Sequence, residues 1–157
     1  MASDLLFDIS KFDLNARFAD EAAVGKVLFQ TGSMRHLDYV IWANEDFSLG
    51  LGMKRVRQDE FWVPGHIPGR PLLPGVIMIE AAAQLCSYCR QRKLNSTGFL
   101  AFTRCDDCSF RGQVVPGDDF VLMAKELESN RRRFISRTQG LVGGRLVFEA
   151  TITGMAV

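Results

Sequence analysis

The most continuous apolar stretch of the chain predicts one long, buried helix. Residues 76–89 read VIMIEAAAQLCSYC and are apolar or small almost throughout, with Glu80 and Gln84 as polar exceptions. A helix that is apolar on every side packs against protein on every side, and these 14 residues suit a buried core helix better than a membrane span. We expect the helix to begin at Gly75 and to end near the cations of residues 90–93, which suit the negative end of a helix dipole.

Strand-like patterns precede this helix. Residues 37–43 and 49–56 have the composition of strands, and the NED sequence between them is a turn signal, so we expect a hairpin. Before the hairpin, residues 16–29 are amphipathic and are expected to form a helix.

The last sixty residues are expected to form three strands. They lie at 98–103, at 120–127 and from Phe134 onward, and turn signals at 115–118 and in the RRR segment separate them. One buried helix wrapped by about five or six mostly antiparallel strands is an α+β architecture. In the last stretch one face would carry Leu146, Phe148, Ala150 and Ile152, and the other Arg145, Val147, Glu149, Thr151 and Thr153.

Residues 64–75, PGHIPGRPLLPG, form a segment of another kind, which we call the Gly/Pro loop. Seven of its twelve positions are Gly or Pro. Proline fixes φ and lacks an N–H donor, so this segment cannot be a helix or a central strand. It must be a stiff, ordered loop that leads directly into the long helix.

Composition is typical of a single-domain globular protein, and we treat residues 1–157 as one domain. The chain is 47% hydrophobic and long enough to fold without a disulfide or a metal. Its net charge of +1 excludes a strongly basic nucleic-acid binder, and its apolar content excludes disorder. Asp4 and Asp8 interrupt an N-terminus that has no basic region, so we expect no secretory signal and a cytoplasmic protein with reduced thiols.

The four cysteines formally match a zinc pattern. Cys86 and Cys89 form one pair, Cys105 and Cys108 form another, and 15 residues separate the pairs. The first pair ends a predicted helix, the second follows a predicted strand, and neither pair encloses a glycine. We therefore interpret the four as small buried thiols and predict no metal site.

Two polar side chains on the predicted helix are candidates for chemistry. Glu80 and Gln84 are four residues apart, so they lie on one stripe of an otherwise apolar helix. A carboxylate in such a place is costly unless it is paired, neutralised or used. The apolar residues on both sides argue against plain solvent exposure, so Glu80 is a candidate acid.

His66 lies inside the Gly/Pro loop, directly before this helix. A lone histidine is more often structural, but a rigid loop that leads to the helix of Glu80 makes His66 a candidate base. A histidine takes up a proton near neutral pH, and a carboxyl group kept from water tends to hold one, so the two could work together. Free N–H groups at Gly75 and Val76 could bind a developing oxyanion.

The segment PGHIPGRPLLPGVIMIEAAAQ resembles the active-site segment of FabZ-type 3-hydroxyacyl-(acyl carrier protein) dehydratases, GHFPGxPxxPGVxxxEAxAQ. His66 and Glu80 are 14 residues apart, as in that family. Glutamate at position 80, where the related FabA-type enzymes have aspartate, favours the FabZ branch. The similarity covers residues 34–157 and includes FR at 110–111, VVPGD at 114–118 and FEATI at 148–152.

The resemblance implies a hot-dog fold, in which a curved, mostly antiparallel sheet wraps a long central helix. It implies a homodimer, which in the family often assembles further into a trimer of dimers, with active sites that take His66 from one chain and Glu80 from the other. The substrate would be an acyl chain on the phosphopantetheine arm of an acyl carrier protein, and no cofactor is needed. His66 would remove the C2 proton, the Gly75 N–H would polarise the thioester carbonyl, and protonated Glu80, oriented by Gln84, would protonate the leaving C3 hydroxyl.

Two parts of the chain depart from the family pattern. Where the family carries PHRxPFLLVDR, this chain reads GSMRHLDYVIWANED, and we interpret His36 there as structural or on the surface. Residues 1–33 match nothing in the pattern. Because first-strand and N-terminal residues help to line the acyl tunnel in relatives, the acyl chain length stays open, as does a specialised polyketide substrate.

Two basic clusters are candidates for docking an acidic carrier protein. Nucleic-acid binding is disfavoured because the chain is neutral and has no interleaved aromatic residues, and a solvated hairpin is the plainer alternative. The clusters are Arg131, Arg132 and Arg133, and Arg90, Arg92 and Lys93 at the end of the helix.

Two other functions stay open at this point. A hot-dog thioesterase would hydrolyse acyl thioesters with a carboxylate and water, but the G-H-x-P-G segment argues against it. A non-catalytic subunit that binds acyl chains or carrier protein would keep the fold, but the presence of both His66 and Glu80 argues against that.

Overall fold

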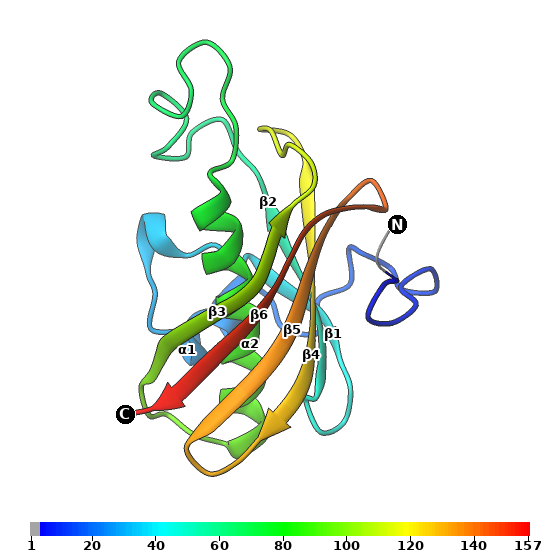
Figure 1. Cartoon of the computed structure of the whole chain (residues 1–157), viewed down its shortest axis with the longest axis vertical. Helices are drawn as coiled ribbons and strands as arrows, with labels where there is room; N and C mark the ends of the chain where they lie inside the picture. Colours follow the sequence, from blue (N-terminus) through cyan, green and yellow to red (C-terminus); the bar gives the residue numbers. More distant parts are fainter. Residues whose placement is uncertain (1–3) are drawn as a thin grey trace.

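A six-stranded antiparallel sheet curves around one long helix in residues 4–157, the part of the chain that the computed structural model describes (Figure 1). Strands follow the order β1-β2-β4-β5-β6-β3 across the sheet, so β1 and β3 are its edges. This arrangement confirms the α+β class and the hot-dog fold. The elements are α1 (Glu21–Val27), a 3-10 helix (Gly32–Met34), β1 (Tyr39–Ala43), β2 (Leu49–Arg55), α2 (Gly75–Leu94), β3 (Leu100–Phe110), β4 (Asp119–Ser129), β5 (Arg133–Val142) and β6 (Arg145–Ala156).

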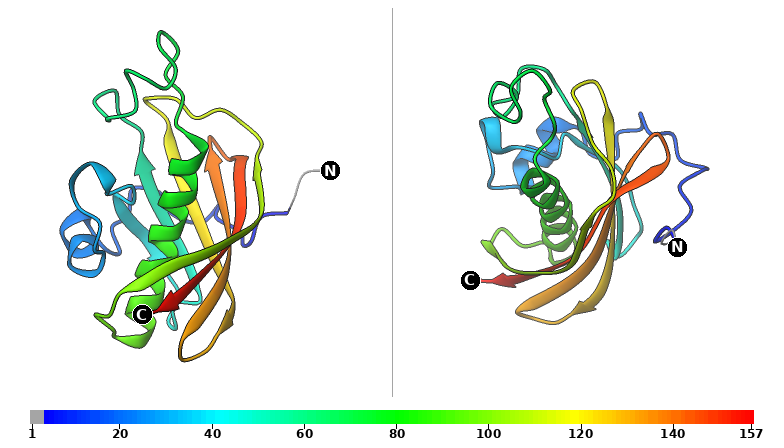
Figure 2. Two further views of the ribbon diagram at one scale, coloured as in Figure 1. Left: turned by 60° about the vertical axis from the view of Figure 1, so that its left-hand side comes forward. Right: turned by 45° about the horizontal axis from the view of Figure 1, so that its top comes forward.

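Helix α2 lies in the hollow of the sheet, as the right-hand view of Figure 2 shows. It begins at Gly75, as predicted. It approaches β2 closely because β2 carries glycine at the contact: a Cβ on Gly50 would lie only 2.6 Å from Sγ of Cys89. The expectation that protein covers α2 on all sides is wrong at its first turn, where Val76 is 70% exposed beside an open groove.

The hairpin β1–β2 and strand β4 lie where the sequence predicts them. Strand β3 is longer than predicted, because it continues through Cys105 and Cys108. The prediction of three strands after residue 97 is wrong, since the described chain has four there. Gly143 and Gly144, with φ of 58° and 78°, form the tight turn that divides the last stretch into β5 and β6.

Pairing between β5 and β6 shifts by one residue near the start of β6. Gly140 lies opposite Phe148 and Leu141 lies opposite Leu146, so Val147 is an extra residue in the ladder. As a result Val147 and Phe148 both join the core around α2, whereas Leu146 packs on the other face. The predicted alternation of faces is therefore wrong at this bulge.

Helix α1 is shorter than the helix predicted for residues 16–29. The Asp20 side chain accepts a hydrogen bond from the Ala23 N–H at 2.9 Å and caps the helix, which then begins at Glu21. The residues before Asp20 are not helical because Ala19 forms an antiparallel bridge with Val40 of β1.

The N-terminal segment covers the outer face of the sheet, on the side away from α2 (Figure 2). An apolar cluster there joins Met53 and Met123 of the sheet to Phe7, Phe12 and Leu14. This segment has no counterpart in the family pattern, yet it keeps an apolar sheet face from water. None of the helices within residues 4–157 has both the length and the hydrophobicity to cross a membrane.

Candidate active site

His66 lies on the Gly/Pro loop, which rises above the sheet and has no helix or strand before Gly75, as predicted (Figure 1). The loop closes on itself, because the Leu72 N–H donates to the His66 carbonyl at 2.8 Å. The imidazole Nδ1 lies 2.8 Å from the Leu72 carbonyl oxygen. Since a carbonyl oxygen only accepts, Nδ1 carries a proton, so Nε2 of this exposed side chain is the ring nitrogen at which a proton can be taken up.

His66 borders an open, mainly apolar groove of about 440 Å³. The groove also contains Gly75, Val76 and Ile79 from the start of α2, and Phe110 from the end of β3. Glycine is needed at position 75 because a Cβ there would lie 2.8 Å from two carbons of the Phe110 ring. The first turn of a helix leaves its N–H groups without intrahelical acceptors. A base and an N–H donor therefore line one groove.

Gln84 lies in the protein interior and holds the Glu80 carboxylate by a hydrogen bond. Its side chain is fully buried, and its Nε2 donates to Glu80 Oε1 at 2.9 Å and to the Met34 carbonyl at 2.7 Å. Its Oε1 accepts from the N–H groups of His36 and Leu37 at 2.8 and 3.0 Å. The amide thus makes four hydrogen bonds, which fix its orientation and that of one carboxylate oxygen of Glu80.

Glu80 and His66 line different cavities of one chain. Glu80 lies in a smaller cavity between α2 and the edge of the sheet, together with Leu100 and Phe102. The groove of His66 is bordered instead by Phe110, at the other end of β3. Strand β3 therefore touches both cavities, one near each of its ends.

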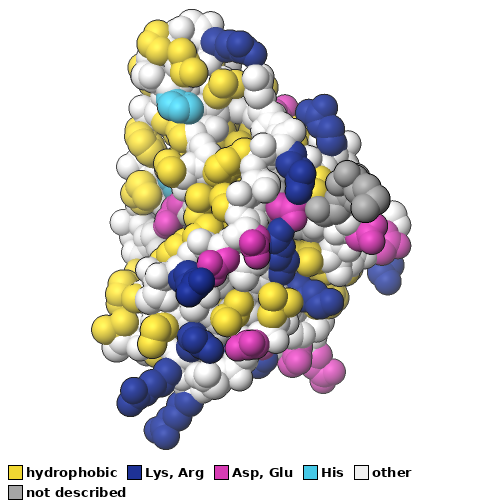
Figure 3. Space-filling view, in the orientation of Figure 1, with side chains coloured by type: hydrophobic (Ala, Val, Ile, Leu, Met, Phe, Trp, Pro, Cys, Tyr) yellow, Lys and Arg dark blue, Asp and Glu magenta, His cyan; other side chains and the backbone are white. Residues whose placement is uncertain are grey.

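An exposed apolar face surrounds this edge strand. Figure 3 shows hydrophobic side chains gathered along one side of the molecule. Phe29 and Phe99, the residue just before β3, pack edge to face with ring centroids 5.8 Å apart. Because β3 is a sheet edge, it also presents backbone groups that pair with no other strand in residues 4–157. The exposed apolar residues at this strand include Phe102 and Phe110 on β3, Phe99 directly before it, Phe29 against Phe99, and Val76 in the groove with Phe110.

The predicted basic clusters differ in exposure. Arg131, Arg132 and Arg133 are exposed where β4 turns into β5, and Arg92 is exposed at the end of α2. Arg90, by contrast, is 2% exposed and donates hydrogen bonds to the β4–β5 turn. The prediction that Arg90 contributes to a docking surface is therefore wrong, because the side chain is buried. Lys93 is half-buried and pairs with Glu126 of β4.

The four cysteines lie on two different elements. Cys86 and Cys89 are buried on α2, and burial raises the pKa of both thiols. Cys105 is half-buried and Cys108 is exposed, both on β3, so the prediction of four buried thiols is wrong for this second pair. Within residues 4–157 no three His, Cys, Asp or Glu side chains are grouped as a metal ion would require.

A buried charged cluster beside the Gly/Pro loop was missed by sequence reasoning. Lys54 of β2 is 2% exposed, and its Nζ lies 2.6 Å from Oε1 of Glu60 and 3.2 Å from Nδ1 of His36. His36 is 1% exposed, which places this residue in the interior. A signal was present, because Lys54 follows the apolar run LGLGM of a strand, just as Glu80 interrupts an apolar helix.

The cluster has a defined charge state. Burial and the nearby Lys54 charge lower the pKa of His36 to about 4, against the opposite effect of Glu60, so the imidazole is neutral at pH 7. Burial would raise the pKa of Glu60, but hydrogen bonds from Lys54 and from the Arg57 N–H outweigh it and hold that pKa below its ordinary value. Lys54 therefore faces a carboxylate and a neutral ring.

Solved structures share this fold. The dehydratase heterocomplex ApeI:P from Xenorhabdus doucetiae matches with a TM-score of 0.73 at 14% identity, over 85% of this chain and 90% of that one. A sigma28-regulated virulence protein from Campylobacter jejuni matches with a TM-score of 0.67 at 17% identity, over 92% and 95%. These similarities establish the hot-dog fold.

Sequence comparison defines the family. The model of the FabA-like domain matches residues 30–151. A 3-hydroxyacyl-(acyl-carrier-protein) dehydratase FabZ from Alkaliphilus metalliredigens is 40% identical over 108 residues, 66% of this chain and 71% of the relative. Another FabZ, from Bradyrhizobium diazoefficiens, is 32% identical over 148 residues, 92% of this chain and 94% of the relative. The chain belongs to the FabA-like family.

We expect His36 to make the folded protein less stable in acid. Its pKa of about 4 lies below the value of 6.5 for a free histidine, so between these pH values the unfolded chain binds a proton that the folded chain does not. This contribution to stability is fully present above pH 6.5 and is lost as the pH falls towards 4, by about 3 kcal/mol. Urea unfolding at pH 7 and pH 4 measures the loss.

The control is His36→Asn, whose side-chain oxygen can still accept from Lys54 but does not titrate. Its free energy of unfolding should fall by about 3 kcal/mol less over the same pH range. An equal loss of unfolding free energy in the wild type and in His36→Asn would contradict the assignment of this pH dependence to His36.

Proposed function

We propose that this protein dehydrates 3-hydroxyacyl thioesters carried by an acyl carrier protein, in fatty-acid or related polyketide synthesis. The observation that carries the proposal is one groove that contains both His66, whose Nε2 makes no hydrogen bond within residues 4–157, and Gly75 and Val76, whose N–H groups begin α2 and have no acceptor within the helix. Such a groove supports removal of a proton next to a carbonyl whose oxygen is held by N–H donors. The names of the FabZ relatives describe the same reaction.

The reaction is an elimination of water, in which one proton leaves C2 and another is added to the hydroxyl oxygen on C3. Nε2 of His66 takes the C2 proton, and the electron pair of that C–H bond passes toward the thioester carbonyl, whose oxygen accepts from the Gly75 N–H. The pair then forms the C2=C3 double bond as the C3–O bond breaks, and protonated Glu80 gives its proton to the departing hydroxyl. The products are a trans-2-enoyl thioester and water. Transfer of the proton from His66 back to Glu80 through solvent restores the enzyme.

Gln84 is a positioning residue in this mechanism. It holds one oxygen of Glu80 by an N–H donor at 2.9 Å. A carboxyl oxygen that accepts this hydrogen bond leaves the other oxygen to carry the proton that the reaction uses.

A second copy of this chain completes the site. When two β3 edges pair antiparallel about a two-fold axis, the first residues of one strand lie beside the last residues of the other. Since Glu80 and His66 lie near opposite ends of β3, the Glu80 of one chain is then brought next to the His66 groove of its partner. The same pairing covers the exposed phenylalanines of this face.

Removing either reacting group should abolish most of the activity. His66→Ala and Glu80→Gln should each lower kcat for hydration of a crotonyl or longer enoyl thioester by about 10²–10⁴-fold, because each removes one proton transfer. Enoyl absorbance measures the rate, and Glu45→Gln, at an exposed turn carboxylate, is the matched control. Wild-type rates in both site variants would contradict the proposal.

The same assay separates the alternatives when free thiol is followed in parallel with a 3-hydroxyacyl substrate. A dehydratase produces enoyl absorbance without thiol. Thiol release would instead identify a thioesterase, and neither signal would identify a non-catalytic subunit.

The exposed arginines at 131–133 are the proposed docking surface for the acidic carrier protein. Arg131→Glu combined with Arg132→Glu should raise KM about tenfold for carrier-bound substrate and leave KM for a small-thiol analogue unchanged. Lys125→Glu combined with Arg145→Glu reverses two exposed charges elsewhere and is the control. Equal effects on both substrates, or in both variants, would refute this docking surface.

A further inference from the structure

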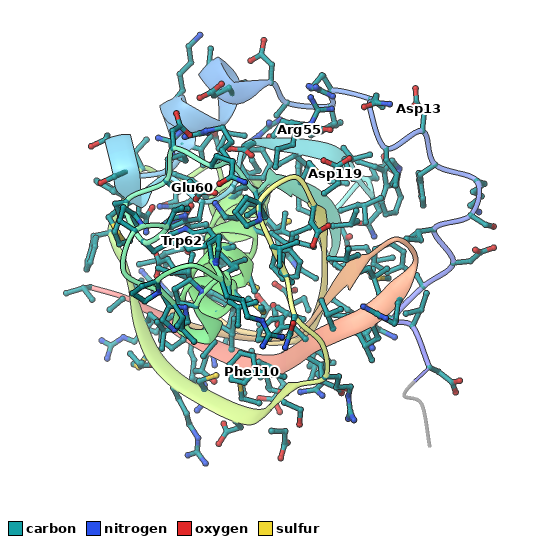
Figure 4. The ribbon with its side chains drawn as sticks, turned by 90° about the horizontal axis from the view of Figure 1, so that it is seen from above. Asp13, Arg55, Glu60, Trp62, Phe110 and Asp119 are labelled. Carbon is teal, nitrogen blue, oxygen red and sulfur yellow. The ribbon has the colours of Figure 1, made fainter. Side chains whose placement is uncertain are left out.

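The Lys54–Glu60 ion pair ties the segment before the Gly/Pro loop to the sheet. Lys54 belongs to β2, and the two side chains are only 3% and 6% exposed. The Glu60 carboxylate also accepts from Trp62 Nε1–H at 3.2 Å and from the Arg57 N–H at 2.8 Å. Figure 4 shows Glu60 and Trp62 next to each other. One carboxylate thus fixes both ends of the segment 57–62.

Stability alone is a weak reason for such a pair. Removing two charges from water offsets much of their attraction, and apolar residues of similar size often stabilise a fold as well. The pair does, however, restrict geometry, because a buried carboxylate with three donors has one well-defined position.

Glu60 is connected to His66 through Trp62. The Trp62 ring is 4% exposed and donates to Glu60, while the Trp62 carbonyl accepts from the His66 N–H at 2.8 Å. A shift of Glu60 therefore moves Trp62 and, with it, the backbone of the candidate base.

Lys54 is connected to Glu80 through His36. The Lys54 ammonium group lies 3.2 Å from Nδ1 of the neutral His36 ring. The backbone N–H of His36 donates to the Gln84 side-chain oxygen, and the Gln84 side-chain NH2 group donates to the Glu80 carboxylate. One buried cluster is thus linked by hydrogen bonds to both candidate reacting groups.

We propose that Lys54 and Glu60 are positioning residues, which set where the His66 imidazole lies relative to the first turn of α2. This inference rests on the proposed function, because it takes His66 as the base. A misplacement of about 1 Å can lower a rate on the order of 10²-fold, so the pair controls kcat although both side chains are buried away from the groove.

The test is the double variant Lys54→Met/Glu60→Gln. It removes both charges together, so neither is left unpaired, and it breaks the tie to β2. The glutamine keeps one side-chain oxygen, which can accept from either the Trp62 or the Arg57 N–H, the two donors that now bond to different oxygens of Glu60. We expect a Tm close to that of the wild type, a kcat on a small enoyl thioester at least about tenfold lower, and a KM within about twofold.

The matched control is Arg57→Gln/Asp59→Asn, which removes an exposed ion pair of 2.8 Å from the same segment and should keep the wild-type kcat. A wild-type kcat in Lys54→Met/Glu60→Gln, an equal loss in the control, or a change in KM alone would overturn the inference.

Trp62→Phe keeps the ring packing and removes only the N–H donor, so it serves if the double variant fails to fold. A kcat lowered several-fold supports the inference, and an unchanged kcat overturns it. Wild-type protein without dehydratase activity would remove the proposed function and this inference together, whereas an active wild type with unaffected variants would remove this inference alone.

Discussion

Helix α2 lies inside the curve of the sheet, so every polar side chain on its buried side must find a partner there. Gln84 meets this requirement with four hydrogen bonds, to Glu80, to the Met34 carbonyl and to two N–H groups at residues 36–37. The amide joins the helix to the segment that precedes β1. That segment carries His36, which reaches the Lys54–Glu60 pair. The packing of α2 and the geometry of the candidate site therefore depend on the same buried contacts.

Within one chain the two candidate reacting groups are each held in position but lie in different cavities. The imidazole of His66 is fixed by the Leu72 carbonyl in a groove at one end of β3, and Glu80 is fixed by Gln84 in a cavity near the other end. Within residues 4–157 no further strand pairs with the edge of the sheet between them, and exposed apolar side chains flank this edge. A two-fold pairing of this edge would satisfy its backbone groups and complete two sites at once.

The parts of the structure that depend on local composition could be predicted from the sequence. The long apolar run predicts α2, the dense Gly and Pro predict the loop, and the His66–Glu80 spacing identifies the candidate site. The predictions that are wrong concern features that depend on contacts between residues distant in the chain. The bulge at Val147 follows from its pairing with β5, and the burial of Arg90 follows from the position of the β4–β5 turn. A local sequence pattern does not show which distant residues will become neighbours in the fold.

If one site takes His66 from one chain and Glu80 from another, two inactive variants must complement each other. A chain carrying His66→Ala and a chain carrying Glu80→Gln, co-expressed with different affinity tags, can be purified as a mixed dimer. Such a dimer holds one intact His66 and one intact Glu80, on different chains, so it should recover about half of the wild-type rate, from one complete site of two. A mixed dimer no more active than either parent would contradict a site shared between chains.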